Sequence, residues 1–122
     1  PLHACACSKA IAAHAGPDFQ DRMLQGPLRR YTEHTLTGGS GLEAELARIR
    51  VCGFAECVEE IETGVASVAA PVHLGTLGVA FSIGATGPIR RFTPDHRATI
   101  GQALIELADR VAARIQRACA NP

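Results

Sequence analysis

Aromatic residues are scarce in this chain of 122 residues, which has no tryptophan, one tyrosine and four phenylalanines. Hydrophobic residues still make up 47% of the sequence, so a core can form, but alanine, valine, leucine and isoleucine must fill it. A chain of this length suits one domain with one core. We therefore expect residues 1–122 to form a single domain.

The chain also lacks an excess of either charge. Twelve Lys and Arg residues balance twelve Asp and Glu residues, which gives a formal net charge of zero. A protein that binds nucleic acid by itself needs a basic face to displace the counterions around phosphates. The composition therefore argues against a stand-alone nucleic-acid binder, and it leaves open a DNA-binding domain elsewhere in the same protein.

Several sequence motifs are absent as well. No apolar run approaches the roughly 20 residues needed to cross a bilayer, and no signal-peptide pattern opens the chain. There is no Gly-x-Ser-x-Gly motif, phosphate loop or dinucleotide fingerprint, and residues 84–87 are too few to form one. The five cysteines are odd in number, which favours a reduced, cytoplasmic setting over a disulfide framework.

Three short apolar runs, rich in Val, Ala, Phe and Ile, occupy residues 54–58, 65–72 and 77–83. Runs of this length between Gly, Thr and Glu residues are typical of buried strands. The last two runs are joined by residues 73–76, a link short enough for an antiparallel hairpin. Because parallel strands would need about a dozen linking residues, the sheet is predicted to be antiparallel.

Helical patterns surround these runs. An alanine-rich segment ends at Gly16-Pro17, and Ser40 with Glu43 has the spacing of a capping box. Thr93-Pro94-Asp95 is typical of a helix start, with Thr93 as the cap, and the apolar stripe that follows reaches residue 119. The predicted helices are residues 4–15, 18–24, 40–52 and 93–119, with a surface loop over 28–39. The fold class is therefore α+β, with helices flanking the antiparallel sheet.

A set of short motifs carries a resemblance to a known family. These motifs are Leu2-His3-Ala4 with Lys9-Ala10, Arg50-x-x-Gly53-Phe54, Glu59-Glu60, Gly64-Val65, Ala69-Ala70-Pro71-Val72 and Gly87-Pro88. In their order and spacing these motifs resemble the effector-binding domain of IclR-type bacterial transcriptional regulators, over nearly the whole chain.

The resemblance implies a GAF-like domain that binds a small metabolite, a carboxylate or another catabolic intermediate, and that assembles into a homodimer or homotetramer. It also implies a winged helix-turn-helix domain that binds DNA, and then the first strands of the effector domain, both ahead of Pro1. The chain opens without Met, so we expect a fragment whose effector domain is incomplete at its N-terminus. No catalytic residue, metal or cofactor is expected.

The resemblance further implies an effector pocket between the first helix and the strands. Carried over to this sequence, its residues are Ala6, Cys7, Cys57, Ser67, Gly84 and Thr86, of which Gly84 and Thr86 are expected to end the third strand. Cys57 stands where some family members have Asp, Gly84 where some have Ser, and Ser8 replaces a family Gly. The pocket would then be less polar, which favours a larger or more apolar effector, such as an aromatic acid, over a glyoxylate- or pyruvate-like one.

Taken without the resemblance, the polar residues of the strands leave two interpretations open. The hydroxyl groups of Ser67 and Thr86 can hold a ligand among small side chains, or they can be ordinary buried and strand-end hydroxyls. Glu60, between the first two strands, is expected to form a structural pair or cap rather than to act as an acid or base.

The cysteines leave further alternatives. His3, Cys5, Cys7 and Cys57 are four soft ligands, the number that a structural zinc requires. The same thiols could form a redox switch or serve a GAF-like thiol enzyme such as a sulfoxide reductase, whereas small buried cysteines are the ordinary interpretation. Alternate residues of a helix point about 200° apart, so Cys5 and Cys7 could share a ligand only in an extended segment.

Overall fold

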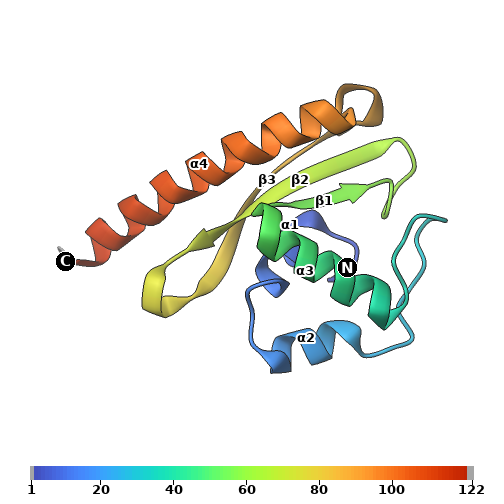
Figure 1. The fold of residues 1–122 in the computed structure, drawn as a ribbon, viewed down its shortest axis with the longest axis horizontal. Coiled ribbons are helices and arrows are strands. Elements are labelled where there is room, and N and C mark those ends of the chain that lie inside the picture. Colours follow the sequence, from blue (N-terminus) through green and yellow to red (C-terminus); the bar gives the residue numbers. More distant parts are fainter. Residues whose placement is uncertain (1, 121–122) are drawn as a thin grey trace.

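The computed structural model describes residues 2–120 and has the expected α+β architecture. Along the chain its elements are α1 (Ala6–Ala12), α2 (Pro17–Leu24), α3 (Gly39–Cys52), β1 (Ala55–Val58), β2 (Val65–His73), η1 (Gly75–Leu77), β3 (Val79–Pro88), η2 (Ile89–Arg91) and α4 (Pro94–Ala120). The strands form one antiparallel sheet in the order β1-β2-β3. Figure 1 shows α4 along one side of this sheet and α1, α2 and α3 on the other.

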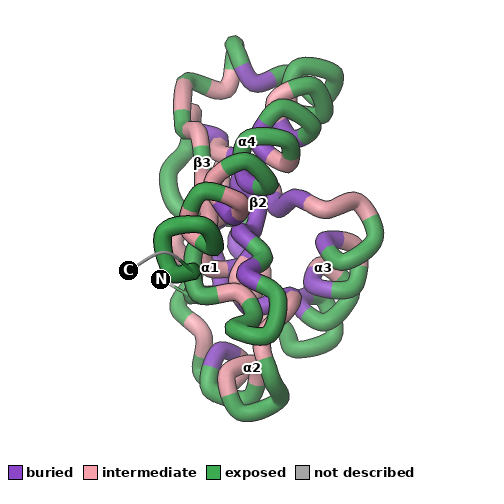
Figure 2. Tube along the Cα trace, turned by 90° about the vertical axis from the view of Figure 1, so that its left-hand side faces the viewer, coloured by how far each residue is buried: buried purple, intermediate pink, exposed green. Residues whose placement is uncertain are grey.

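The central strand β2 is buried on both of its faces. Ala69 packs in a cluster with α1, α3 and β1, whereas Ala66, Val68 and Ala70 pack in a second cluster with α4. Successive side chains of a strand point to opposite faces, so one strand can serve both clusters. In Figure 2 the buried residues gather along β2 and on the sides of the helices that face it.

Close backbone approaches hold the two helical layers against the sheet. A Cβ atom added to Gly101 of α4 would lie 2.6 Å from the ring of Phe54, and one added to Gly84 of β3 would lie 2.8 Å from Cys7 Sγ. Real Cβ atoms do not come this near to other atoms, so both helices depend on glycine at their contact points. The loop before α3 is held by Thr35, whose hydroxyl donates to the carbonyl oxygen of Glu60 at 2.5 Å.

Several predicted helix ends are confirmed. Gly53 ends α3 in the left-handed conformation, with φ at 90°, and the backbone N–H of His96 donates to Thr93 Oγ1 at 3.3 Å at the start of α4. The capping box at Ser40 is wrong, because α3 begins at Gly39 after an N-cap at Gly38 and no side chain caps it. A run of glycines before the helix leaves the serine already inside the first turn.

Several element boundaries also differ from the prediction. The first helix begins at Ala6 rather than at residue 4, because Cys5 is extended, with φ at −82° and ψ at 132°. The third strand does not end at Gly84 and Thr86, since both residues pair with β2 and β3 continues to Pro88. Its predicted start at Leu77 is instead the end of the turn η1.

Among residues 2–120, no helix is both long enough and apolar enough to cross a membrane.

Candidate functional site

One row of residues crosses all three strands on the face toward α1. Cys57 of β1 is the register partner of Ser67 of β2, and Ser67 is the partner of Thr86 of β3. Side chains directly opposite in antiparallel strands share a face, with Cβ atoms about 4.5–5.5 Å apart. These three residues therefore form a continuous strip across the sheet.

This strip is the floor of a cavity of about 220 Å³. Cys57 is only 4% exposed, whereas Thr86 of β3 and Ile61 and Glu62 of the turn after β1 are exposed. The cavity is therefore closed at Cys57 and open to solvent at its other lining residues. The remaining lining residues are Cys5, Ile61, Glu62, Val65 and Ala66. An engineered cavity of about 150 Å³ is enough to hold benzene, so the volume suits a compound the size of one substituted ring.

The cavity exists because α1 covers the neighbouring row and stops there. That row is Ala55, Ala69 and Gly84. The helix α1 lies on it through Cys7, whose Sγ is 2.8 Å from the position that a Cβ of Gly84 would take. The helix begins only at Ala6, so the residue before it is not part of the helical layer. The extended residue Cys5 lines the space that is left.

The six residues expected from the sequence take different places in the structure. Cys57, Ser67 and Thr86 line the cavity together. Ala6, Cys7 and Gly84 are not among the lining residues: Ala6 is 1% exposed in the core, and Cys7 with Gly84 forms the contact between α1 and β3.

Sequence reasoning missed several lining residues, chiefly Cys5, Ile61 and Glu62. The alanine-rich pattern placed Cys5 inside a helix, although its extended conformation is what turns it to the cavity. Ile61 is an exposed large apolar residue in a turn of glutamates, and that break in the polar pattern was the available signal.

The cavity has little charge of its own. Glu62 is its one ionisable carboxylate and no Lys or Arg lines it among the described residues. Burial raises the pKa of the Cys57 thiol, and the negative charge of Glu60 raises it further. Cys57 is therefore a neutral thiol near pH 7, and the polar groups offered to a ligand are mainly the hydroxyls of Ser67 and Thr86.

A buried ion pair lies next to this site and is already satisfied. Lys9 of α1 is 0% exposed, and its Nζ donates to both carboxylate oxygens of Glu60 at 3.0 Å and to the carbonyl oxygen of Glu56 at 2.6 Å. These bonds tie α1 to the end of β1 and to the turn that follows it. Glu60 thus has the structural role expected from the sequence.

The thiols of Cys5 and Cys7 form a hydrogen-bonded pair. The hydrogen bond from Cys7 lowers the pKa of Cys5, and it outweighs the opposite effect of burial. The same bond raises the pKa of Cys7, which keeps its proton as the donor. Within residues 2–120, no three His, Cys, Asp or Glu side chains lie close enough together to hold a metal ion.

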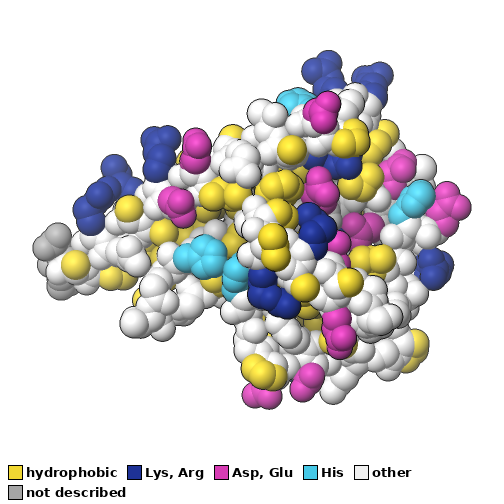
Figure 3. All heavy atoms as spheres, in the orientation of Figure 1, with side chains coloured by type: hydrophobic (Ala, Val, Ile, Leu, Met, Phe, Trp, Pro, Cys, Tyr) yellow, Lys and Arg dark blue, Asp and Glu magenta, His cyan; other side chains and the backbone are white. Residues whose placement is uncertain are grey.

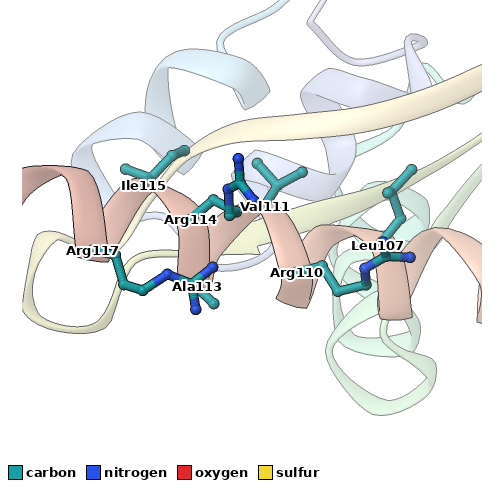
Figure 4. A pocket seen from close by; sticks show the side chains of 7 residues that line it. All are labelled: Leu107, Arg110, Val111, Ala113, Arg114, Ile115 and Arg117. Carbon is teal, nitrogen blue, oxygen red and sulfur yellow. The ribbon is translucent and has the colours of Figure 1, made fainter.

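A larger groove of about 480 Å³ lies along α4. Figure 4 shows that its walls are side chains of this one helix, with arginine residues interspersed among apolar ones. They are Leu107, Arg110, Val111, Ala113, Arg114, Ile115 and Arg117. In Figure 3 the basic side chains stand out along α4, away from the sheet. A groove formed by a single helix lacks the enclosing walls typical of small-molecule sites.

The family model for the bacterial transcriptional regulator IclR, C-terminal domain, matches residues 1–113. The chain belongs to the IclR family. Over 95 residues it is 38% identical to the glycerol operon regulatory protein of Streptomyces griseus, covering 78% of this chain and 37% of that protein. It is 36% identical over 108 residues to the regulator BhcR of Paracoccus denitrificans, covering 88% of this chain and 39% of that one. The IclR chain described here therefore spans less than two fifths of these relatives.

Solved structures agree with this IclR assignment. A transcriptional regulator of the family from Silicibacter sp. TM1040 superimposes with a TM-score of 0.85 at 31% identity, covering 94% of this chain and 45% of that one. An IclR homologue from Microbacterium hydrocarbonoxydans, crystallised with 4-hydroxybenzoate, gives a TM-score of 0.79 at 24% identity over 97% of this chain and 47% of that one. At that identity the second likeness shows the fold alone. The expected family and the α+β fold are both confirmed.

Proposed function

We propose that this chain is the effector-binding domain of an IclR-type regulator and that the cavity over Cys57, Ser67 and Thr86 binds the effector. The observation that carries the proposal is that three residues distant in sequence share one open cavity of about 220 Å³. The family assignment supports a regulatory role rather than an enzymatic one, because the curated relatives are named as transcriptional regulators.

The lining of the cavity favours one class among the compounds expected from the sequence. A carboxylate would find hydroxyl donors at Ser67 and Thr86 but no cation, and it would lie in a cavity that Glu62 also lines. Charged groups are costly to desolvate without a partner of opposite charge. We therefore place a ring-sized catabolic intermediate with a neutral hydroxyl or carbonyl group ahead of a small free carboxylate.

The remaining residues implied by the family likeness act indirectly in this proposal. Ala6, Cys7 and Gly84 set the distance between α1 and the sheet, and so determine the depth of the cavity. The effector would favour one arrangement of a cytoplasmic homodimer or homotetramer and so control a separate DNA-binding domain. Such control requires that the effector bind two arrangements with different affinity.

A thermal-shift panel tests the site. The probes are 4-hydroxybenzoate, 4-hydroxybenzyl alcohol and pyruvate, since a ligand that binds only the folded state raises the melting temperature. We expect the neutral alcohol to give the largest shift and Ser67→Ala/Thr86→Val to abolish it. Thr99→Val, which removes a hydroxyl from the exposed face of α4, serves as the matched control. A shift that survives in the Ser67/Thr86 variant would disprove the site.

A further inference from the structure

We propose that Cys5 is a site of reversible oxidation, at which a hydroperoxide forms a sulfenic acid that Cys7 converts into a Cys5–Cys7 disulfide. This proposal concerns the thiols alone and does not depend on the identity or the existence of an effector.

Access for the oxidant comes through the cavity. Cys5 is partly exposed and lines the same open space of about 220 Å³ as Thr86, so a molecule as small as hydrogen peroxide can reach this residue from solvent. Cys57 lines that space too, but it is buried, and its raised pKa keeps it as the less reactive thiol. The thiolate is the nucleophile in such reactions.

The pairing of Cys5 with Cys7 follows from the backbone at the start of α1. Cys5 is extended whereas Cys7 is the second residue of the helix, so the 200° separation of alternate helical residues does not apply to them. Their thiols are hydrogen-bonded, which brings the two sulfur atoms near each other before any oxidation. Cys5 lines the open cavity whereas Cys7 does not, which assigns the attacking thiolate to Cys5. The lowered pKa of Cys5 agrees with this role.

The chemistry balances with the hydroperoxide as the only oxidant. The Cys5 thiolate attacks the peroxide O–O bond, takes one oxygen as S–OH, and releases hydroxide or alkoxide, which is protonated to water or an alcohol. The Cys7 sulfur then attacks Cys5 Sγ, the S–O bond breaks, and the proton of Cys7 leaves with the hydroxyl as water. Two thiols lose two protons and two electrons in all, and one peroxide is reduced.

Oxidation would also change the contact between α1 and the sheet. Cys7 Sγ now fills the space above Gly84, and a bond to Cys5 draws that sulfur toward the cavity. A disulfide holds its two Cβ atoms about 3.5–4.5 Å apart, so it would fix the separation of Cys5 and Cys7 at the start of α1. The oxidation state would therefore alter the wall of the cavity.

Peptide mass spectrometry on the whole chain tests the proposal. Lys9 follows both thiols, so trypsin releases residues 1–9 with Cys5 and Cys7 in one peptide. After one equivalent of hydrogen peroxide and then iodoacetamide, we expect this peptide to lose two hydrogen atoms and to take up no alkyl group, reversibly with dithiothreitol. Its oxidation should be at least about tenfold faster than that of Cys119, which is exposed on α4.

Variants assign the two roles. Cys5→Ser should leave Cys7 reduced and open to alkylation, whereas Cys7→Ser should leave a sulfenic acid on Cys5 that dimedone traps. Cys52→Ser, which removes a partly buried thiol outside the cavity, is the matched control and should oxidise at the rate of the original chain. The far-ultraviolet circular dichroism of each variant checks its fold. The proposal would be overturned if the peptide of residues 1–9 and the peptide with Cys119 oxidised at equal rates, or if Cys5→Ser did not slow the oxidation of the first peptide. A disulfide between Cys5 and Cys57 would also overturn it.

Discussion

Lys9 and Glu60 are 51 residues apart in the chain, yet the lysine Nζ lies 3.0 Å from both carboxylate oxygens of the glutamate. Lys9 is also the only lysine of the sequence, and it is fully buried. A buried ion pair contributes little compared with an apolar pair of equal shape, but the loss of one partner leaves an uncompensated charge. The pair therefore makes the attachment of α1 to the turn after β1 sensitive to single substitutions.

Lys9→Met should destabilise the domain by about 3–5 kcal/mol, because it leaves Glu60 buried without its counter-ion. Urea unfolding measures the loss. The double variant Lys9→Met/Glu60→Leu should recover most of it, since both charges are then removed. Arg90→Met takes a positive charge from an exposed position and should cost less than about 0.5 kcal/mol. A double variant no more stable than Lys9→Met would contradict the assignment of this pair.

Glu45 should contribute to stability in a pH-dependent way. Burial alone would raise its pKa, but the hydrogen bond from Arg48 and the charges of Lys9 and Arg48 lower it overall. A carboxylate whose pKa is lowered in the folded state stabilises the protein above its unfolded pKa, about 4.3 for Glu, and loses that effect as the pH falls.

We therefore expect Glu45→Gln to cost about 1 kcal/mol at pH 7 and clearly less at pH 3. Urea unfolding at both pH values gives the two differences. Glu43→Gln, on the exposed face of the same helix, controls for the loss of a charge and should change stability by less than about 0.5 kcal/mol. A cost for Glu45→Gln that grows toward pH 3 would reverse the predicted sign.

Gly84→Ala should separate α1 from the sheet. Its new Cβ would lie 2.8 Å from Cys7 Sγ and 3.2 Å from the carbonyl oxygen of Val68, and overpacking of this kind costs about 1–3 kcal/mol. Cys7→Ala in the same chain removes the sulfur and should restore part of the loss. Gly39→Ala is the matched control, because nothing lies within 4 Å of its Cβ position. If Gly84→Ala and Gly39→Ala change the melting temperature by the same amount, the close contact between Gly84 and Cys7 is refuted.

Gly101→Ala tests the other helical layer. Alanine is the better helix former by about 1 kcal/mol, but a Cβ at Gly101 would lie 2.6 Å from Phe54 Cγ and Cδ1. We expect the steric clash to outweigh the gain in helix propensity, so that chemical unfolding gives a free energy of unfolding lower by about 1–2 kcal/mol. Phe54→Leu combined with Gly101→Ala should be more stable than the sum of the single changes predicts. Strict additivity would show that the two residues are not in contact.

Much of the architecture could be predicted from local patterns. The apolar runs near residues 54–58 and 65–72 become β1 and β2, and Thr93 and Gly53 mark helix ends as expected. These signals involve only neighbouring residues. The error at Ser40 arose because a capping-box spacing is also compatible with a helix whose N-cap lies two residues earlier, at Gly38.

The site was less accessible to sequence reasoning because it depends on register and on one backbone torsion. Ser67 faces both Cys57 and Thr86 only in the observed pairing, and a shift of one residue would turn its side chain to the other face of the sheet. Cys5 reaches the cavity through an extended conformation that its alanine-rich neighbours do not predict. The partnership of Lys9 with Glu60 is likewise a product of tertiary packing.

The alanines of β2 have a mechanical consequence. Ala66 and Ala70 touch the layer of α4 and Ala69 touches the layer of α1, and an alanine side chain has no rotamers with which to absorb a neighbour's displacement. In a close-packed interior there is also little free volume to accommodate such a displacement. A displacement imposed on one face of this strand must therefore shift its backbone, and the opposite face moves with it.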